Sequence, residues 1–258
     1  PGLSQPTAVN AWMSSSILAE QTAAGTDAAK EAVANKRAKL LIAAMTLEQK
    51  MQQLTGSVPE IVAELPNCKG ARHVASIAAL NIPTFRITTG PVGLGQNDCV
   101  SASIPPVLVT FGGETIDITA YTDPSSAKAT ALPSAMGAAA SFDPTVAGSY
   151  GELIGTEMLN LALHEFEAPG MNLARLPVLG RNFEYFGEDP YLAGTMSVAE
   201  IKAIQAKGLI GMAKHYLANE QETNRTTIQE TVDRQVLREL YLLPFEIVSV
   251  LVLIAIIG

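Results

Sequence analysis

The sequence predicts an α/β fold built on a parallel sheet. Short apolar runs have the length of buried strands, and each is separated from the next by longer segments with helical periodicity. The strand candidates are 81–88, 171–173 and 209–213. The helix candidates in the same half of the chain are 143–161, 189–208 and a helix that begins at Asp233. Strand followed by helix, repeated along the chain, is typical of parallel α/β architectures.

The N-terminal region predicts an arm followed by helices. Residues 1–25 are rich in Ser, Thr, Ala and Gln with little periodicity, which favours an extended arm on the surface. A helix is expected next, because Val33, Leu40, Leu41 and Ala44 recur at helical spacing. Thr46-Leu47-Glu48-Gln49 then has the pattern of a capping box, and Gly56 is a plausible stop.

The helices of the second half carry clear start signals. Asp143-Pro144 and Asp189-Pro190 each place an N-capping side chain before a proline in the first turn. Pro244 is expected to bend or end the helix that begins at Asp233.

A long connection is expected between residues 97 and 131. Its Ser, Thr, Asp, Pro and Gly content indicates an excursion over one face of the sheet, with a short strand at 107–111. Cys68 and Cys99 are expected to be buried free thiols, although in an exported protein they could form a disulfide. The sequence leaves the compartment open, with a secreted or periplasmic location slightly favoured.

Charge and composition exclude several classes of partner. The net charge is -8, with 17 Lys and Arg outnumbered by 25 acidic residues, so no basic stripe could neutralise the phosphates of a nucleic acid. The apolar stretch 247–257 is shorter than the roughly 20 residues that a membrane-spanning helix needs. His73 and His164 lie in no metal-binding pattern, and the turn Gly90-Pro91-Val92-Gly93 lacks the features of a nucleotide-binding loop. We therefore expect no cofactor, no metal, no membrane insertion and no nucleic acid.

Three segments are expected to form the functional site. In barrels of parallel strands, active groups lie beyond the carboxyl ends of the strands. That rule selects Thr89–Gly95, Arg175–Asp189, and Lys214-His215 with the following Asn219–Arg225.

Two of these segments are dense in hydrogen-bonding side chains. Lys214-His215 and the polar run after it could donate several hydrogen bonds to a polyhydroxylated sugar, or they could form a solvated loop. Arg181 could bind a sugar hydroxyl or a carboxylate, and an ion pair with Glu184 that only braces the loop is an equal alternative.

The motifs resemble those of glycoside hydrolase family 3. Gly180-Arg181-Asn182-Phe183-Glu184-Tyr185-Phe186-Gly187-Glu188-Asp189-Pro190, followed about 30 residues later by Lys214-His215, is similar to the β-glucosidase and β-xylosidase branch of that family. The resemblance extends over most of residues 40–246. It implies a TIM-type (β/α)8 barrel and hydrolysis of terminal β-linked glycosides by the retaining route. It also implies that Arg181, Lys214 and His215 bind hydroxyls of the sugar.

The chain departs from the family pattern at the first sugar-binding turn. The family usually has an Asp before Gly-Pro and an Arg shortly after, whereas this chain has Thr89 and Gly95. Since a Thr hydroxyl cannot accept the paired bonds of a carboxylate, we expect either that Asp98 substitutes or that the subsite is altered.

The resemblance assigns no catalytic carboxylate to this chain. The family's nucleophilic Asp lies on a later barrel strand, and its acid/base lies in a second domain. We therefore expect residues 26–258 to be a barrel domain that is incomplete at its C-terminal end, supplying sugar-positioning residues and associating with another chain to complete the fold. Alternatives are a non-catalytic fragment or sugar-binding module, β-xylosidase specificity, and the N-acetylglucosaminide branch, which Tyr216-Leu217-Ala218-Asn219 disfavours.

Overall fold

A computed structural model describes residues 11–55, 72–95, 108–111, 114–117 and 129–248 of the chain. These residues divide into two compact units. The first contains the described residues of Pro1–Ile61 and His73–Phe85, and the second contains Arg72 and the described residues of Arg86–Val252. Among the described residues, no helix is both long and apolar enough to cross a membrane. Cys68, Cys99, Asp98 and Gly56 lie outside the described residues.

The first unit consists mainly of helices. In chain order it contains η1 (Ala11–Met13), α1 (Ser15–Ala23), α2 (Asp27–Ala44), α3 (Leu47–Gln53), β1 (Arg72–Val74) at its border, and η3 (Ala78–Leu80). The expectation of an extended arm over residues 1–25 is wrong for the described part of it. Ser14 caps α1 by accepting a hydrogen bond from the Ile17 N–H at 3.4 Å, and Ile17 is the buried residue of this helix. With one buried side chain, α1 carries almost no apolar periodicity, which is why the sequence pattern missed it.

The predicted helix α2 and the capping box of α3 are confirmed. The Gln49 N–H donates to the Thr46 hydroxyl at 3.2 Å, and the Thr46 N–H donates to the Gln49 side chain at 2.9 Å. The two reciprocal bonds satisfy donors that would otherwise be unpaired at the start of α3.

The second unit has an α/β fold. Its described parallel strands are β2 (Phe85–Thr89), β5 (Glu165–Glu167) and β6 (Ile210–Gly211). In register, Thr88 pairs with Phe166, and Phe166 pairs with Gly211. Phe166 and Thr88 are fully buried at the centre of these strands.

The strand expected at 171–173 is wrong, and the regular strand lies earlier, at β5. Pro169 has no N–H to donate to a ladder. The chain beyond it makes only isolated parallel bridges, from Gly170 to Tyr185 on one side and to Lys214 on the other. The strand expected at 209–213 is present as the shorter β6.

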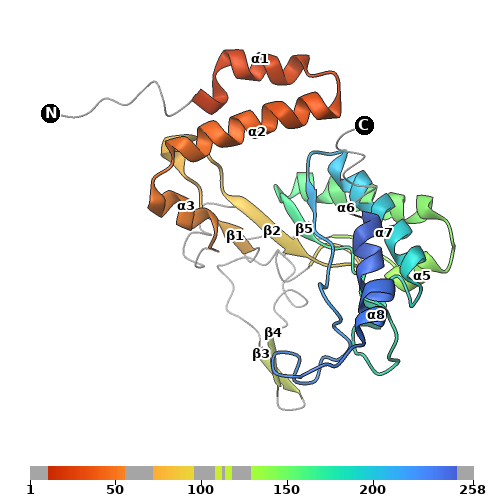
Figure 1. Cartoon of the computed structure of the whole chain (residues 1–258). Coiled ribbons are helices and arrows are strands. Elements are labelled where there is room, and N and C mark those ends of the chain that lie inside the picture. The colour runs from red at the N-terminus through yellow and green to blue at the C-terminus, as the bar shows by residue number, and fades with distance from the viewer. Residues whose placement is uncertain (1–10, 56–71, 96–107, 112–113, 118–128, 249–258) are drawn as a thin grey trace. The chain divides into compact units, whose positions relative to one another are not determined.

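Helices α6 (Pro144–Asn160) and α7 (Pro190–Gln205) pack against each other beside the sheet (Figure 1). Asp143 and Asp189 cap them as predicted, accepting from Thr145 at 2.9 Å and Leu192 at 2.6 Å. The short α5 (Ala135–Ala139) contacts both helices. The two long helices approach closely at Gly151, where a Cβ atom would overlap the carbonyl oxygen of Glu200. The buried side chains of this interface include Ile154, Met158, Met196 and Ile204.

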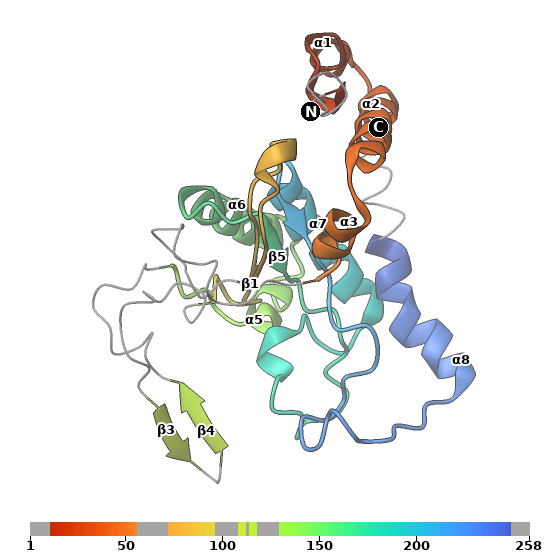
Figure 2. The same cartoon turned by 90° about the vertical axis from the view of Figure 1, so that its left-hand side faces the viewer.

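The predicted excursion contains a hairpin. Strands β3 (Leu108–Phe111) and β4 (Glu114–Asp117) pair antiparallel (Figure 2). The strand expected at 107–111 is confirmed as β3, and β4 was not predicted. The remaining residues of that connection, 97–107, 112–113 and 118–128, lie outside the described residues.

The last described helix begins where the sequence predicts. Asp233 caps α8 (Arg234–Val236) by accepting from Gln235 at 2.8 Å. The helix continues as the π-helical segment η6 (Leu237–Leu242) and then as an α-helix through residue 248. Pro244 therefore does not end the helix. Because proline cannot donate to the carbonyl four residues before it, the wider turns of η6 accommodate the missing bond.

Candidate functional site

A cleft of about 1060 Å³ lies in the second unit and is lined by residues that follow its parallel strands. Thr89 is the last residue of β2, Glu167 is the last residue of β5, and Lys214 and His215 follow β6. Arg181 lines the same cleft from the segment just before η5 (Asn182–Glu184). The parallel bridges from Gly170 to Tyr185 and Lys214 bring this segment beside the strand ends.

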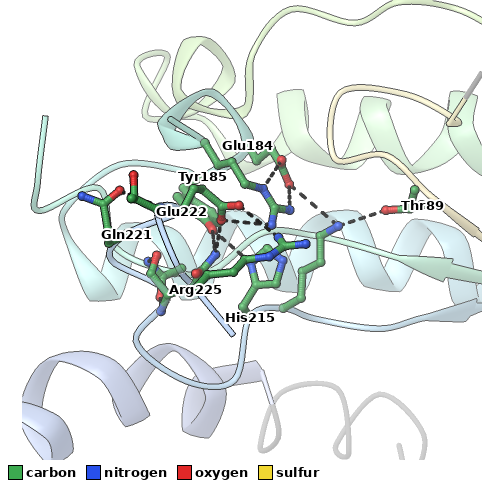
Figure 3. A network of polar contacts seen from close by, with 12 residues as sticks. Thr89, Glu184, Tyr185, His215, Gln221, Glu222 and Arg225 are labelled. Carbon is green, nitrogen blue, oxygen red and sulfur yellow. Dashed lines mark hydrogen bonds and ion pairs between the residues drawn. The ribbon is translucent and has the colours of Figure 1, made fainter. Parts of the chain in front are cut away.

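Arg181 is held by a two-pronged ion pair with Glu184, which is labelled in Figure 3. Nε lies 2.6 Å from Oε1, and Nη2 lies 2.7 Å from Oε2. Such paired bonds fix the plane of a guanidinium as well as its position. The Glu184 bonds raise the pKa of Arg181, and Glu184 itself is buried. Arg181 is thus a fixed cation at the wall of the cleft.

Lys214 reaches the same carboxylate from the other side. Its Nζ lies 3.8 Å from Glu184 Oε2 and donates a hydrogen bond to Thr89 Oγ1 at 3.0 Å. Glu184 therefore balances the charge of two cations that line one cleft, and Thr89 orients the ammonium group.

A second carboxylate, Glu222, connects the loop after β6 to Arg181. It accepts from Asn219 Nδ2 at 2.8 Å and from Arg225 Nη1 at 3.0 Å, with Arg181 Nη1 at 3.4 Å. Burial opposes ionisation, but the Asn219 bond and the charges of Arg181 and Arg225 hold the pKa of Glu222 below its ordinary value. Glu222 is therefore ionised at neutral pH.

His215 is neutral in this setting. Burial, reinforced by the positive charges of Arg181 and Lys214, lowers the pKa of His215 to about 4. Its Nδ1 lies 3.0 Å from the hydroxyl of Tyr185, and the peptide bond between Lys214 and His215 is cis. The ring therefore presents a neutral hydrogen-bonding group to the cleft.

The glycine-rich turn after β2 has a backbone that only glycine adopts readily. Gly90 and Gly93 have φ angles of 132° and 121°. A Cβ atom on Gly93 would overlap the carbonyl oxygen of Thr130, and one on Gly90 would overlap that of Gly93. The turn thus folds back tightly and leaves Thr89 at the cleft.

Comparison with known proteins assigns the chain to a family. The model of the "Glycosyl hydrolase family 3 N terminal domain" matches residues 119–249, just over half of the 258 residues. The chain belongs to glycosyl hydrolase family 3. The expected resemblance is confirmed, and the matched region contains Arg181, Lys214 and His215.

Two relatives of this chain are named as enzymes that act on different sugars. The chain is 36% identical over 174 residues to thermostable beta-glucosidase B of Acetivibrio thermocellus, covering 67% of this chain and 21% of that protein. It is 34% identical over 184 residues to an exo-alpha-(1->6)-L-arabinopyranosidase of Bifidobacterium longum, covering 71% of this chain and 22% of that protein. The chain therefore spans about one fifth of the length of these relatives.

Solved structures of family members share the fold. Beta-glucosidase 3B of Thermotoga neapolitana in complex with glucose aligns with a TM-score of 0.64 at 30% identity, over 80% of this chain and 26% of that one. A β-glucosidase of Streptomyces venezuelae in complex with D-glucose aligns with a TM-score of 0.65 at 32% identity, over 83% of this chain and 23% of that one.

The family member described here brings four of its five expected site residues together. Arg181, Lys214, His215 and Thr89 line one cleft. The ion pair of Arg181 with Glu184, offered as an alternative to a binding role, is present as well. Asp98, expected as a substitute for the usual Asp, lies outside the described residues.

The other two histidines, His73 and His164, do not line the cleft. His164 Nδ1 accepts from the backbone N–H of Arg86 at 3.0 Å, and burial lowers its pKa. His73 is buried in the first unit. Within the described residues, no group of three or more His, Cys, Asp or Glu side chains could hold a metal ion.

Sequence reasoning missed two residues that hold the loop after β6 in place. Asn172 and Tyr185 are buried, and both hydrogen-bond to Asn219 in the loop after β6. Tyr185 lies in the motif that carried the resemblance, and Asn172 lies within the region over which the resemblance extends. Their polar groups beside apolar neighbours were a signal that each would need a buried partner.

Proposed function

We propose that this chain supplies the sugar-positioning part of a β-glucosidase, and that the complete protein hydrolyses terminal β-linked glucosides with retention of configuration. The main observation in support of this proposal is that Arg181, Lys214 and His215 line one cleft beyond the strand ends. The glucose complexes of related structures support the choice of sugar.

The cleft offers donors suited to sugar hydroxyls. Guanidinium has five N–H donors, and Glu184 and Glu222 engage three of those on Arg181. Two N–H groups remain for a ligand. The neutral ring of His215 adds a donor or acceptor without a second full charge. Because Glu184 and Glu222 already hold these cations in place, little reorganisation is needed when a hydroxyl binds.

We assign positioning, not bond cleavage, to these side chains. Retaining hydrolysis needs a nucleophilic carboxylate and a general acid roughly 5 Å apart on opposite sides of the glycosidic bond. Glu184 and Glu222 are engaged by Arg181, Lys214, Asn219 and Arg225, which suits a role in fixing cations. By the family pattern, the nucleophile and the acid/base are assigned to sequence that this chain does not contain. Donors that strengthen in the transition state would then act on the sugar while those carboxylates act on the bond.

We also propose that β2, β5 and β6 are neighbouring strands of a (β/α)8 barrel that is incomplete in this chain. The alternation of parallel strands with α6 and α7 supports this arrangement. An open barrel has strand edges that need partners, so we propose that the remainder of the protein, or another chain, completes it.

A non-catalytic sugar-binding module is the second candidate. Thr89 favours it, since the family usually has a carboxylate there and the Thr hydroxyl accepts a bond from Lys214 instead. Thr89 could instead change which sugar the enzyme accepts while hydrolysis is retained, because one relative is named as an arabinopyranosidase. β-Xylosidase specificity is a further alternative that the family resemblance includes.

Hydrolysis by the complete protein separates these candidates. Aryl β-glucoside, β-xyloside, α-L-arabinopyranoside and N-acetyl-β-glucosaminide should be compared, and the β-glucoside should have the highest kcat/KM. Absence of turnover on all four with retained glucose binding would select the module. The 258-residue chain alone should bind glucose without turning over any of these substrates.

Substitution of Arg181 tests whether the cleft binds sugar through this side chain. Arg181→Ala should weaken glucose binding about 10- to 100-fold, the effect of losing hydrogen bonds from a charged donor. Arg181→Lys keeps the charge opposite Glu184 but loses the fork, and should still weaken binding. The control is Arg238→Ala, because Arg238 is exposed on η6 outside the cleft. Titration calorimetry with glucose measures all three. Equal affinities would show that the cleft does not bind sugar through Arg181.

A further inference from the structure

At the wall of the cleft, His215 is connected to Glu222 by a chain of polar side chains. Its Nδ1 lies 3.0 Å from the Tyr185 hydroxyl, and the two rings meet edge to face at 5.9 Å. The same hydroxyl lies 3.3 Å from Asn219 Nδ2, which in turn lies 2.8 Å from Glu222 Oε1. Figure 3 shows Tyr185, His215 and Glu222 gathered in this network.

Glu222 determines which way the Asn219 amide points. An ionised carboxylate only accepts hydrogen bonds, so the amide atom that faces Glu222 must be the nitrogen. The ion pair with Arg225 at 3.0 Å keeps Glu222 in its ionised form. The nitrogen of Asn219 therefore also faces the Tyr185 hydroxyl, and the hydroxyl oxygen accepts from it.

The direction of the next bond follows. A phenol has one hydrogen to donate. With its oxygen accepting from Asn219, Tyr185 can direct that hydrogen to His215 Nδ1. A nitrogen that accepts a hydrogen bond carries no proton, so the proton of the neutral ring must be on Nε2.

We propose that Tyr185 is a positioning residue that holds His215 in the Nε2–H tautomer, so that the cleft receives an N–H donor aimed at a sugar hydroxyl. The tautomer is inferred from these contacts together with the neutral state of the ring. Its use in binding rests on the function proposed above.

The surroundings keep this chain of bonds in place. The backbone of Asn219 is held on both sides by buried Asn172, which accepts from its N–H at 2.9 Å and donates to its carbonyl at 3.1 Å. Tyr185 is fully buried, and burial raises its pKa, so the phenol keeps its proton throughout the neutral range. Gly170 bridges to Tyr185 on one side and to Lys214 on the other, so the segments that carry Tyr185 and His215 flank the same stretch of chain.

Long-range 1H–15N NMR of the 258-residue chain labelled at histidine tests the tautomer at pH 7. The chain has three histidines, and His215→Gln identifies the signals of the third. The expected result is a protonated Nε2 and an unprotonated Nδ1 for His215. Tyr185→Phe keeps the ring and removes the donor, so the two tautomers should become mixed. Tyr150→Phe is the matched control, because Tyr150 is buried, bonds to the Pro133 carbonyl and lies outside the cleft.

A second variant reverses the bond. In Asn219→Asp, the new carboxylate would accept from Tyr185, so the phenol would accept from His215 and the proton should move to Nδ1. A wild-type ring protonated on Nδ1, or a His215 spectrum that neither variant changes, would overturn the proposal.

Glucose affinity connects the tautomer to function. Tyr185→Phe should weaken glucose binding about three- to tenfold, the effect of one neutral hydrogen bond, while Tyr150→Phe should not. A changed tautomer with unchanged glucose affinity would refute the positioning role. If the wild-type chain and every variant fail to bind glucose, the proposed function is wrong. The tautomer of His215 is still decided by the NMR spectrum, independently of glucose binding.

Discussion

The two units differ in how their helices are stabilised. In the first unit, α2 has no fully buried side chain among those described, and the buried apolar residues of the unit are Ile17, Ile77 and Leu80. In the second unit, α6 buries six residues and α7 buries eight. Both units have well-capped helices. Local signals therefore operate in both units, whereas burial supports mainly the second.

This difference concerns function because the cleft lies in the second unit. Arg181, Lys214 and His215 lie a few residues along the chain from Phe186 and Leu209, which belong to a buried core. Functional side chains need such support, because small displacements of positioning groups cost much of their effect. The contrast predicts that equivalent substitutions will have unequal costs in the two units.

The largest contrast is expected for an isoleucine in each unit. Ile154 on α6 is fully buried, whereas Ile42 on α2 is 52% exposed. Ile154→Ala should lower the free energy of unfolding by about 2–5 kcal/mol through lost burial and the cavity left behind. Ile42→Ala should stay within about 0.5 kcal/mol of the wild type. Urea titration followed by circular dichroism measures both. Similar costs would mean that burial does not distinguish the units.

The next effect concerns a carboxyl group buried in the second unit. Glu200 on α7 is 1% exposed, its Oε1 has no hydrogen-bond partner among the described residues, and burial raises its pKa to about 8. The folded state therefore keeps a proton that the unfolded state loses above the ordinary carboxyl pKa of 4.5. The stability that this group contributes is present below that value and is lost as the pH rises toward 8.

The pH profile gives the measurement. Between these values, the free energy of unfolding should fall by up to about 1.4 kcal/mol per pH unit because of Glu200. Glu200→Gln should remove this part of the slope. Glu152→Gln, at an exposed carboxyl on α6, should retain it. Parallel profiles for wild type and Glu200→Gln would show that Glu200 is not held protonated.

Sequence predicted the features that depend on neighbours in the chain. The caps at Thr46, Asp143 and Asp189 involve residues two or three positions apart, so their patterns are visible in a single segment. The cleft residues were found because parallel strands end at one edge and because the motifs resemble a known family. The first argument required only the order of elements, and the second required only the residues of short motifs.

The supporting bonds were beyond sequence reasoning. Lys214 bonds to Thr89 across 125 positions, and Asn219 bonds to Asn172 across 47. No periodicity encodes such pairs. The strand expected at 171–173 failed for a related reason, because Asn172 is used to hold the loop at Asn219 and the ladder there is reduced to single bridges.

The smallest expected effect tests the other half of the comparison, that caps act locally in either unit. Thr46→Ala at the start of α3 and Asp189→Ala at the start of α7 should each cost about 1 kcal/mol, because each removes one acceptor for an unpaired helix N–H. Hydrogen exchange of Gln49 and Leu192, whose N–H groups donate to these caps, reports the loss at each helix. Since a cap acts only on the first turn of its own helix, the loss of stability should not depend on how deeply that helix is buried. A cost at Asp189 several times that at Thr46 would mean that the core of the second unit amplifies even local defects, and that its cleft depends on every part of the unit.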